Sequence, residues 1–283
     1  MAITLREGRP DDAERCGRIC YEAFRAINEA HNFPPDIPSA EMGIGLLSMM
    51  IAHPGFHVVV AERNGAALGS NVLDERSEIA GIGPITVDPN AQNAGVGRLL
   101  MDAVLSRAAS FAGVRLVQAA FHNRSLSLYT KLGFDPREPL SCVQGTPLAR
   151  QLPGCSVRAA TADDLAACDA LCQRVHGHTR SGELSDAIRS GNARVVERGG
   201  RITGYATGIA FFCHAAGESN EDVQALIAAA PAFPGPGFLV PTRNATLLRW
   251  CLEQRLRIVQ PLTLMSMGRY EEPRGVWLPS ISY

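Results

Sequence analysis

The chain has 283 residues, of which 46% are hydrophobic and 19% are charged, and its formal net charge is −1 at pH 7. This composition is too apolar for a disordered chain, and the length suits about two domains of ~100–200 residues each. Because positive and negative charges nearly balance, the composition does not indicate a basic surface for nucleic acid or for an anionic membrane. The longest apolar run, around residues 44–52, is too short for the ~20 residues of a membrane span. Acidic residues occupy the early positions where a secretory signal is basic, so we expect a cytoplasmic protein.

The first half predicts alternating helices and strands. Asp11 or Asp12 begins the first helix, and Asn64-Gly65 is a strong hairpin signal between two strands. The expected strands are 3–7, 57–62, 67–74, 78–87, 114–121 and 140–145, and the expected helices start at 11–12, 39, 95 and 125. We therefore expect an α/β domain with a mixed, mostly antiparallel sheet flanked by helices.

An internal repeat organises the chain. Three pairs of segments resemble each other in the same order: 5–20 with 157–172, 59–69 with 194–204, and 123–129 with 244–250. Three matches in register indicate two copies of one domain. The proline-rich residues 136–154 separate them, so we expect domains at residues 1–150 and 151–283.

Cysteine and histidine spacing gives no metal site. Cys16 and Cys20, like Cys168 and Cys172, are four residues apart in helical stretches, and no CxxC motif occurs. We expect reduced, mostly buried thiols and no bound metal.

A glycine-rich turn at residues 92–97 joins a predicted strand to a strong helix. The first N–H groups of a helix lack internal partners and favour an anion, and Gly95 and Gly97 allow close approach of a phosphate. A Walker A loop would need Lys-Ser/Thr after Gly97, where Arg98-Leu99 stands, and a dinucleotide fingerprint would need a third glycine near Leu100.

A second motif follows one strand later, with the sequence L-Y-x-K-L-G-F at residues 128–134. Together with Q-x-x-G-x-G at residues 92–97, it closely resembles the GCN5-related N-acetyltransferase (GNAT) family. The resemblance covers residues 3–146 well. It reaches the rest of the chain only through the internal repeat.

The resemblance implies acetyl-CoA as co-substrate, with no metal. In the family the pantetheine arm pairs with the strand before the glycine-rich turn, which implies Ile85, Thr86 and Val87. The pyrophosphate lies in the turn itself, which implies Gln92, Asn93, Ala94, Gly95, Val96, Gly97 and Arg98. Asn123 and Ser125 are implied as further contacts. The family's usual Asn, seven residues before the tyrosine, is His122 here, so Asn123 is displaced by one residue.

Transfer of an acetyl group to an amine needs an acid for the departing thiolate and a base for the amine. A phenol near the sulfur can donate a proton, which makes Tyr129 the candidate acid. The family often has a carboxylate on the central strand that acts as the base through water, so the resemblance implies Glu78, with Asp74 and Glu75 as rivals. The sequence contains no G-x-S-x-G motif and no recognisable nucleophilic cysteine, so direct transfer is favoured over a covalent intermediate.

The second copy lacks the glycine loop. Its corresponding region carries Glu218, Glu221 and Asp222, which would repel a pyrophosphate, and Trp250 replaces the tyrosine. We expect a degenerate domain that packs against the first copy, completes the acceptor pocket or binds a regulator. His31, Phe33 and Asp36 are further candidates for contact with an amine.

The prediction is an N-acetyltransferase that moves an acetyl group directly from acetyl-CoA to a small-molecule or peptide amine. A non-catalytic acyl-CoA sensor or regulatory module and a protein acetyltransferase stay open as alternatives. A homodimer also stays open, and the acceptor is not identified.

Overall fold

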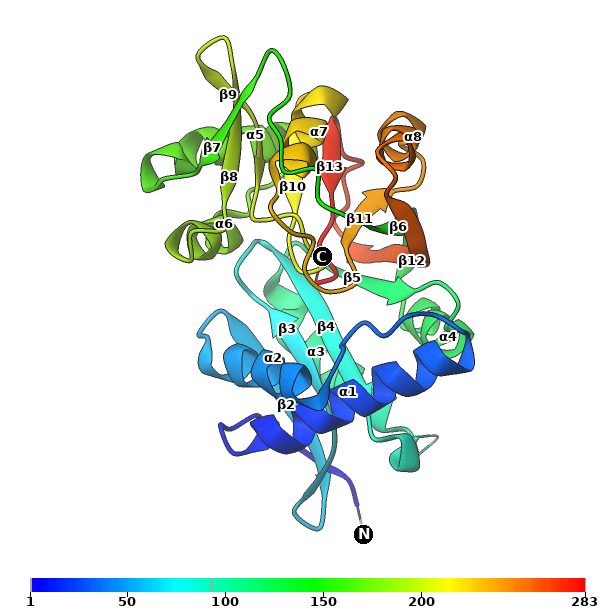
Figure 1. Cartoon of the computed structure of the whole chain (residues 1–283). Coiled ribbons are helices and arrows are strands. Elements are labelled where there is room, and N and C mark those ends of the chain that lie inside the picture. Colours follow the sequence, from blue (N-terminus) through cyan, green and yellow to red (C-terminus); the bar gives the residue numbers. More distant parts are fainter. Residues whose placement is uncertain (1, 93, 283) are drawn as a thin grey trace.

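Every helix and strand expected in the first half is present in the computed structural model, which describes residues 2–92 and 94–282 (Figure 1). The elements of this half are β1 (Thr4–Glu7), α1 (Asp12–Ala30), α2 (Ala40–Ala52), β2 (Phe56–Arg63), β3 (Ala66–Asp74), β4 (Ile79–Val87), η1 (Pro89–Ala91), α3 (Val96–Arg107), η2 (Ala108–Ser110), β5 (Gly113–Ala119), α4 (Asn123–Lys131) and β6 (Asp135–Gln144). β6 begins at Asp135 rather than at residue 140, so it includes two prolines that the sequence suggested for a linker.

The second half repeats the alternation of helices and strands, with several shorter strands and one longer strand, β12. Its elements are β7 (Ser156–Ala159), η3 (Ala162–Asp164), α5 (Leu165–His176), α6 (Ser181–Arg189), β8 (Arg194–Arg198), β9 (Arg201–Ala206), β10 (Ala215–Gly217), α7 (Asn220–Ala229), β11 (Phe238–Pro241), α8 (Ala245–Glu253), β12 (Arg257–Gly268) and β13 (Val276–Leu278). The fold is therefore the mixed α/β class that the sequence predicts.

The hairpin between β2 and β3 forms where it was expected. Asn64 and Gly65 have φ angles of 55° and 77°. Positive φ at both central residues is typical of a type I′ turn, which matches the twist of the strands it joins. The paired strands lie near one edge of the larger sheet, next to β1 and β4.

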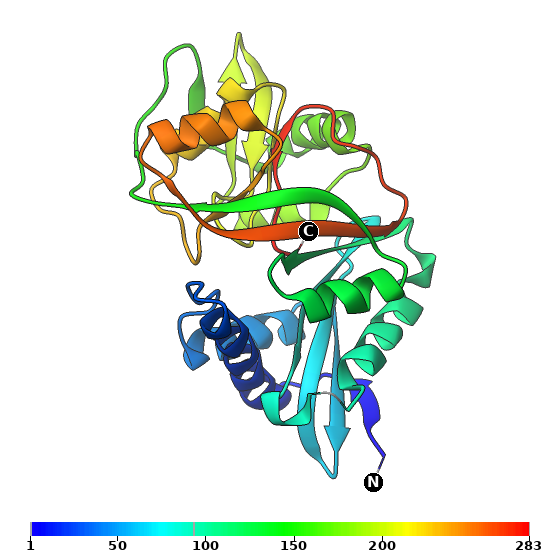
Figure 2. The ribbon, with the colours of Figure 1, turned by 90° about the vertical axis from the view of Figure 1, so that its right-hand side faces the viewer.

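The larger sheet contains strands from both halves, in the order β1-β2-β3-β4-β5-β12-β6-β11. β12 lies between β5 and β6 and is antiparallel to both, with Leu262 opposite Ala119 on one side and Leu140 on the other. Figure 2 shows β6 (green) and β12 (orange-red) side by side across the middle of the molecule. The smaller sheet has the order β13-β10-β9-β8-β7. The larger sheet therefore contains strands from both sides of residue 150, where the sequence predicted a domain boundary.

Helices cover both faces of the larger sheet. α1 and α2 lie on one face, and α3 and α4 lie on the other (Figure 2). α1 and α2 approach each other closely because Gly17 faces the backbone of α2; a Cβ atom there would lie 2.4 Å from the Cα atom of Ile44.

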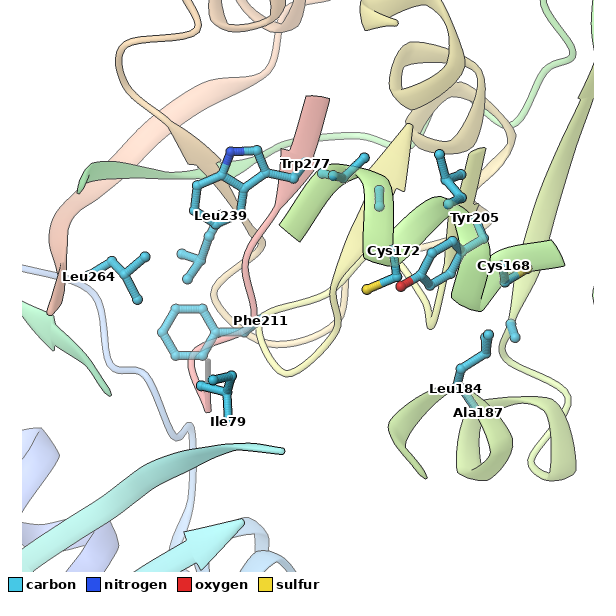
Figure 3. Close-up of a cluster of buried hydrophobic side chains, with 14 of the residues drawn as sticks. Ile79, Cys168, Cys172, Leu184, Ala187, Tyr205, Phe211, Leu239, Leu264 and Trp277 are labelled. Carbon is cyan, nitrogen blue, oxygen red and sulfur yellow. The ribbon is translucent and has the colours of Figure 1, made fainter. Parts of the chain in front are cut away.

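The two halves share a hydrophobic core. Ile79 and Leu140 from the first half belong to one buried cluster with Phe211, Leu239 and Leu264 from the second. Figure 3 shows Leu239, Phe211 and Ile79 in succession within this cluster. Because apolar burial is the main stabilising contribution to folding, the halves are stabilised as one unit.

The internal repeat is visible as the same ion network in both halves. In each, an arginine of the first strand binds the aspartate at the start of the following helix and a glutamate of the neighbouring strand. The residues are Arg6, Asp12 and Glu62 in the first half and Arg158, Asp164 and Glu197 in the second. Every hydrogen bond in these networks is 2.7–3.0 Å long. This agreement supports two copies of one unit.

We expect Leu264→Ala to destabilise the whole protein, because Leu264 is 0% exposed in the strand that joins the halves. A cavity of this kind costs about 2–5 kcal/mol. Ile258→Ala, on the same strand but at a position 47% exposed, is the matched control and should cost under ~1 kcal/mol. Urea denaturation followed by circular dichroism measures both, and equal losses would contradict the role of β12 in the shared core.

Candidate active site

Two neighbouring strands separate and open a cavity. β4 and β5 are parallel and pair only from Ile79 opposite Gly113 to Gly81 opposite Arg115. Beyond Gly81, β4 continues to Val87 and β5 to Ala119, and no strand of the described chain pairs with β4 on that side. Backbone N–H and C=O groups of residues 82–87 that face this gap can therefore bind a ligand in the manner of an added strand.

A cavity of about 740 Å³ fills this gap. Its walls are α1, the ends of β4 and β5, the loop before α3, and α4. The second half contributes Phe211, Phe212, Leu262, Ile281 and Ser282. This volume suits a large, elongated ligand.

The predicted anion site lies at the edge of this cavity. Gly95 precedes α3 in a left-handed conformation with a φ of 79°, which a residue with a side chain rarely adopts. Gly97 lies in the first turn of the helix, where a Cβ atom would meet only the side chains of Val87 and Leu128, at 3.8 and 3.9 Å. The first-turn N–H groups and the helix dipole favour an anion here.

Most of the predicted ligand-binding residues line the same cavity. Those on the cavity wall are Ile85, Thr86, Val87, Gln92, Gly95, Val96, Gly97, Arg98, Asn123, Ser125 and Tyr129. Ala94 is not among the lining residues, and Asn93 lies outside the described residues. Arg98 Nε also donates to Asp102 at 2.9 Å, one helical turn further on.

The start of α4 is tied to β5 by Ser125. Its Oγ donates to Oε1 of Gln118 and to the carbonyl oxygen of His122, both at 2.9 Å. His122 lines the cavity where the family's asparagine would stand, and burial lowers the pKa of its imidazole, as do the nearby Arg124 and His31.

Tyr129 lies in the last turn of α4, on the cavity wall, and only 7% of it is exposed. The Gly-Phe of its motif ends the helix: Gly133 has a φ of 100°, and the Phe134 N–H donates to the Tyr129 carbonyl at 3.0 Å. The Phe134 ring packs edge-on against the tyrosine. Burial raises the pKa of the Tyr129 phenol, so this side chain keeps its proton at neutral pH.

The carboxylates predicted as the base are elsewhere. Glu78 is exposed before β4, pairs with Arg269 at 3.4 Å, and does not line the cavity. Asp74 is bound by Arg76 and Glu75 by Arg107, and neither lines the cavity. β4 lines the gap only after Gly81, so residues 74–78, which precede β4, lie at the end of the strand away from the gap. The structure does not bring Glu78 together with Tyr129.

Asp36 is the single carboxylate that lines this cavity among the described residues. It lies in the loop between α1 and α2, where Gln260 Nε2 of β12 donates to its Oδ1 at 2.6 Å. Burial raises the pKa of this carboxyl group, although the amides of Gln260 and Asn28 favour its ionised form. The sequence pointed to Asp36 only as an acceptor contact, and nothing in it indicated Gln260, because the two are far apart in the chain.

The ring cluster beside Asp36 closes one side of the cavity. Phe33 stacks on Phe121, with centroids 4.1 Å apart, and His31 lies 5.3 Å from the same ring. His31 and Phe121 line the cavity, whereas Phe33 supports Phe121 from behind.

The corresponding helix start in the second half is occupied by its own side chains. Asp222 accepts hydrogen bonds from the Ser219 N–H at 3.0 Å and the Ser219 hydroxyl at 2.8 Å. It also pairs with Arg198. A carboxylate thus fills the place where the first half presents bare N–H groups, and Trp250 stands in α8 where α4 has Tyr129.

Within residues 2–92 and 94–282, no three His, Cys, Asp or Glu side chains gather closely enough to hold a metal ion. None of the helices described has the length and apolar character needed to cross a bilayer.

Comparison with known proteins agrees with this arrangement. A family model described as an acetyltransferase (GNAT) domain matches residues 54–136. A candidate acetyltransferase from Pyrococcus horikoshii has a similar structure, with a TM-score of 0.75 at 17% identity over 97% of this chain and 94% of that chain. A GCN5-related N-acetyltransferase from Sphaerobacter thermophilus has a TM-score of 0.58 at 15% identity, over 97% and 98% of the two chains. No curated protein matches the sequence.

The family model covers the strands and the loop that build the cavity, from β2 to the start of β6. It defines this part of the molecule as an acetyltransferase domain of the GNAT type. The GNAT assignment covers residues 54–136, and the whole-chain structural matches show that the similarity in fold extends through both halves.

We expect Asp36→Asn to stabilise the fold at neutral pH. The pKa of Asp36 is raised in the folded protein, so ionisation favours the unfolded chain. This destabilisation is absent below the unfolded pKa of about 3.9 and grows as the pH rises towards the folded value. Thermal unfolding should therefore give the variant a higher Tm than the wild type at pH 8, and a smaller difference at pH 4. Asp11→Asn, at an exposed position, is the control, and the idea fails if both variants behave alike.

Proposed function

We propose that the protein is an N-acetyltransferase that transfers an acetyl group directly from acetyl-CoA to an amine. The observation that carries the proposal is the single cavity that joins the bare N-terminus of α3, the unpaired edge of β4 and the buried phenol of Tyr129. In this arrangement the pyrophosphate would lie at Gly95 and Gly97, and the pantetheine arm would run along residues 85–87. Arg98, at the same edge, supplies a positive charge.

The chemistry follows from these positions. The amine nitrogen attacks the thioester carbonyl carbon, a C–N bond forms and the C–S bond breaks. Unpaired N–H groups of β4 stabilise the oxyanion that develops on the carbonyl oxygen. Tyr129 donates its proton to the departing thiolate, and its raised pKa suits it to act as a general acid. A base in the cavity accepts the proton that the amine loses. Asp36 is the single carboxylate on the cavity wall among the described residues, and we assign this role to it.

We further propose that residues 151–283 are a degenerate second copy that holds no coenzyme. Asp222 neutralises the start of α7, and the indole of Trp250 has no proton acidic enough to protonate a thiolate. The role of this copy would be to complete the sheet and the acceptor side of the cavity. The cytoplasm is proposed as its location from the sequence alone.

Gly97→Ala tests the anion site. Alanine favours a helix over glycine by about 1 kcal/mol, and the new methyl group meets only side chains at ordinary distances, so the fold should be at least as stable. The same methyl group intrudes where the pyrophosphate would lie, and we expect coenzyme A affinity to fall on the order of tenfold, or ~1.4 kcal/mol. Titration calorimetry with coenzyme A measures it. Gly45→Ala in α2, where the new atom meets nothing within 4 Å, is the matched control.

Tyr129→Phe tests the general acid. The ring and its packing against Phe134 remain, so coenzyme A affinity should change little. Loss of general acid catalysis should lower kcat by about 10²-fold or more. Release of free thiol from acetyl-CoA with a panel of amines measures kcat. An unchanged kcat removes Tyr129 from the mechanism, and coenzyme binding without thiol release for any amine favours a sensor over an enzyme.

A further inference from the structure

We propose that the acceptor is a primary amine with an apolar body, which lies in a second cavity while Asp36 receives the amino group. This inference rests on the proposed function, because it assigns the acceptor side of the same site. It concerns a cavity that the coenzyme loop does not reach.

The second cavity has a volume of about 480 Å³ and lies between the two halves. Five residues line both cavities: Asp36, Ile37, Leu46, Phe211 and Phe212. Because the same side chains form part of both walls, the cavities meet at these residues. A molecule in the second cavity can therefore present one end to the first.

The wall of the second cavity is largely apolar. It includes Ile209, Leu226 and Ala229, and a segment at residues 230–236 that contains three prolines. Two large apolar side chains on its wall, Met42 and Phe212, are 53% and 43% exposed. Exposed apolar groups beside an apolar hollow indicate a site for an apolar ligand.

Polar atoms in the second cavity are few. Arg194 and Asn192 lie on its wall, and Nη1 of Arg194 donates to the carbonyl oxygens of Gly191 and Ala193 at 2.8 Å. Asp36 is the only carboxylate on this wall among the residues described. A polyamine or a basic peptide would leave its remaining charges without acceptors there, which is costly in a buried site.

The surroundings of Asp36 favour a group rich in N–H donors. Nε2 of Gln260 donates to one oxygen of the Asp36 carboxylate. The pairing of β12 with β6 shifts in register between Ile258 and Gln260. Oε1 of Gln260 and Oδ1 of Asn28 are buried and have no hydrogen-bond partner within the described chain. Neither of these two residues lines either cavity, so Asp36 is the acceptor at the junction that the N–H donors of an ammonium group can reach.

The reaction balances with this placement. The ammonium group passes one proton to Asp36, the neutral nitrogen attacks the thioester carbonyl carbon, and the C–S bond breaks as the C–N bond forms. Tyr129 protonates the departing thiolate and regains a proton from the nitrogen as the amide forms, so that one proton, held by Asp36, is released to solvent. The products are an N-acetylated apolar amine and coenzyme A in its thiol form. The apolar body stays in the second cavity throughout.

The test is a series of straight-chain amines, from butylamine to octylamine, titrated by calorimetry into the protein saturated with coenzyme A. Each added methylene group that enters an apolar cavity should tighten binding about fourfold. Ala229→Leu fills space on the wall of the second cavity alone and should weaken octylamine binding on the order of tenfold. Ala229→Ser preserves the space and is the matched control. Affinity that is independent of chain length, or equal in the Leu and Ser variants, overturns the proposal.

The role of Asp36 is measured separately. Wild-type protein should bind octylamine more tightly than octanol, and Asp36→Asn should remove that preference while octanol binding is unchanged. A preference that survives in Asp36→Asn removes Asp36 from the proposal.

The outcomes separate this inference from the proposed function. If coenzyme A binds and only spermidine or a lysine peptide releases thiol, the apolar acceptor is wrong and the acetyltransferase stands. If coenzyme A does not bind, the proposed function is wrong, whereas octylamine binding to the free protein still reports on the second cavity.

Discussion

β12 of the second half lies between β5 and β6 of the first half, and this strand insertion holds the two halves together. β12 pairs with β5 and with β6 through backbone hydrogen bonds, and it brings Leu262 and Leu264 into the shared core. It also carries Gln260 to Asp36. Sheet continuity, core packing and the acceptor side of the cavity therefore come from one strand of the second half.

The cavity results from the separation of two neighbouring strands, β4 and β5. β4 and β5 pair for three residues and then diverge, which leaves one edge of β4 without a strand partner in the described chain. An unpaired strand edge normally invites another strand. Here the edge faces a cavity, beside a helix whose first N–H groups are also unpaired. The fold thus concentrates its free backbone donors where the proposed coenzyme would lie.

Sequence reasoning found the parts of the site that are local. The glycine turn before α3 and the tyrosine in α4 each depend on neighbouring residues, and both stand on the cavity wall. Helices, strands and the Asn64-Gly65 hairpin were predicted for the same reason.

Features set by long-range pairing were not predictable in this way. The insertion of β12 depends on partner strands more than a hundred residues away. No local sequence pattern distinguishes β12 from a strand that pairs within its own half. Glu78 was predicted because the family often has a carboxylate on the central strand, but here it precedes β4, at the end of the strand far from the cavity. The contact of Gln260 with Asp36 spans 224 residues and left no signal in the sequence.

The late position of β12 has a consequence for synthesis. As the chain emerges from the ribosome, β5 and β6 are complete long before residues 257–268 appear. Until then both strands present open edges, which are prone to pairing with other chains. A product that stops before residue 257 would keep those edges and lack the strand that carries Gln260. Synthesis through residue 268 is thus a condition for assembling the pocket.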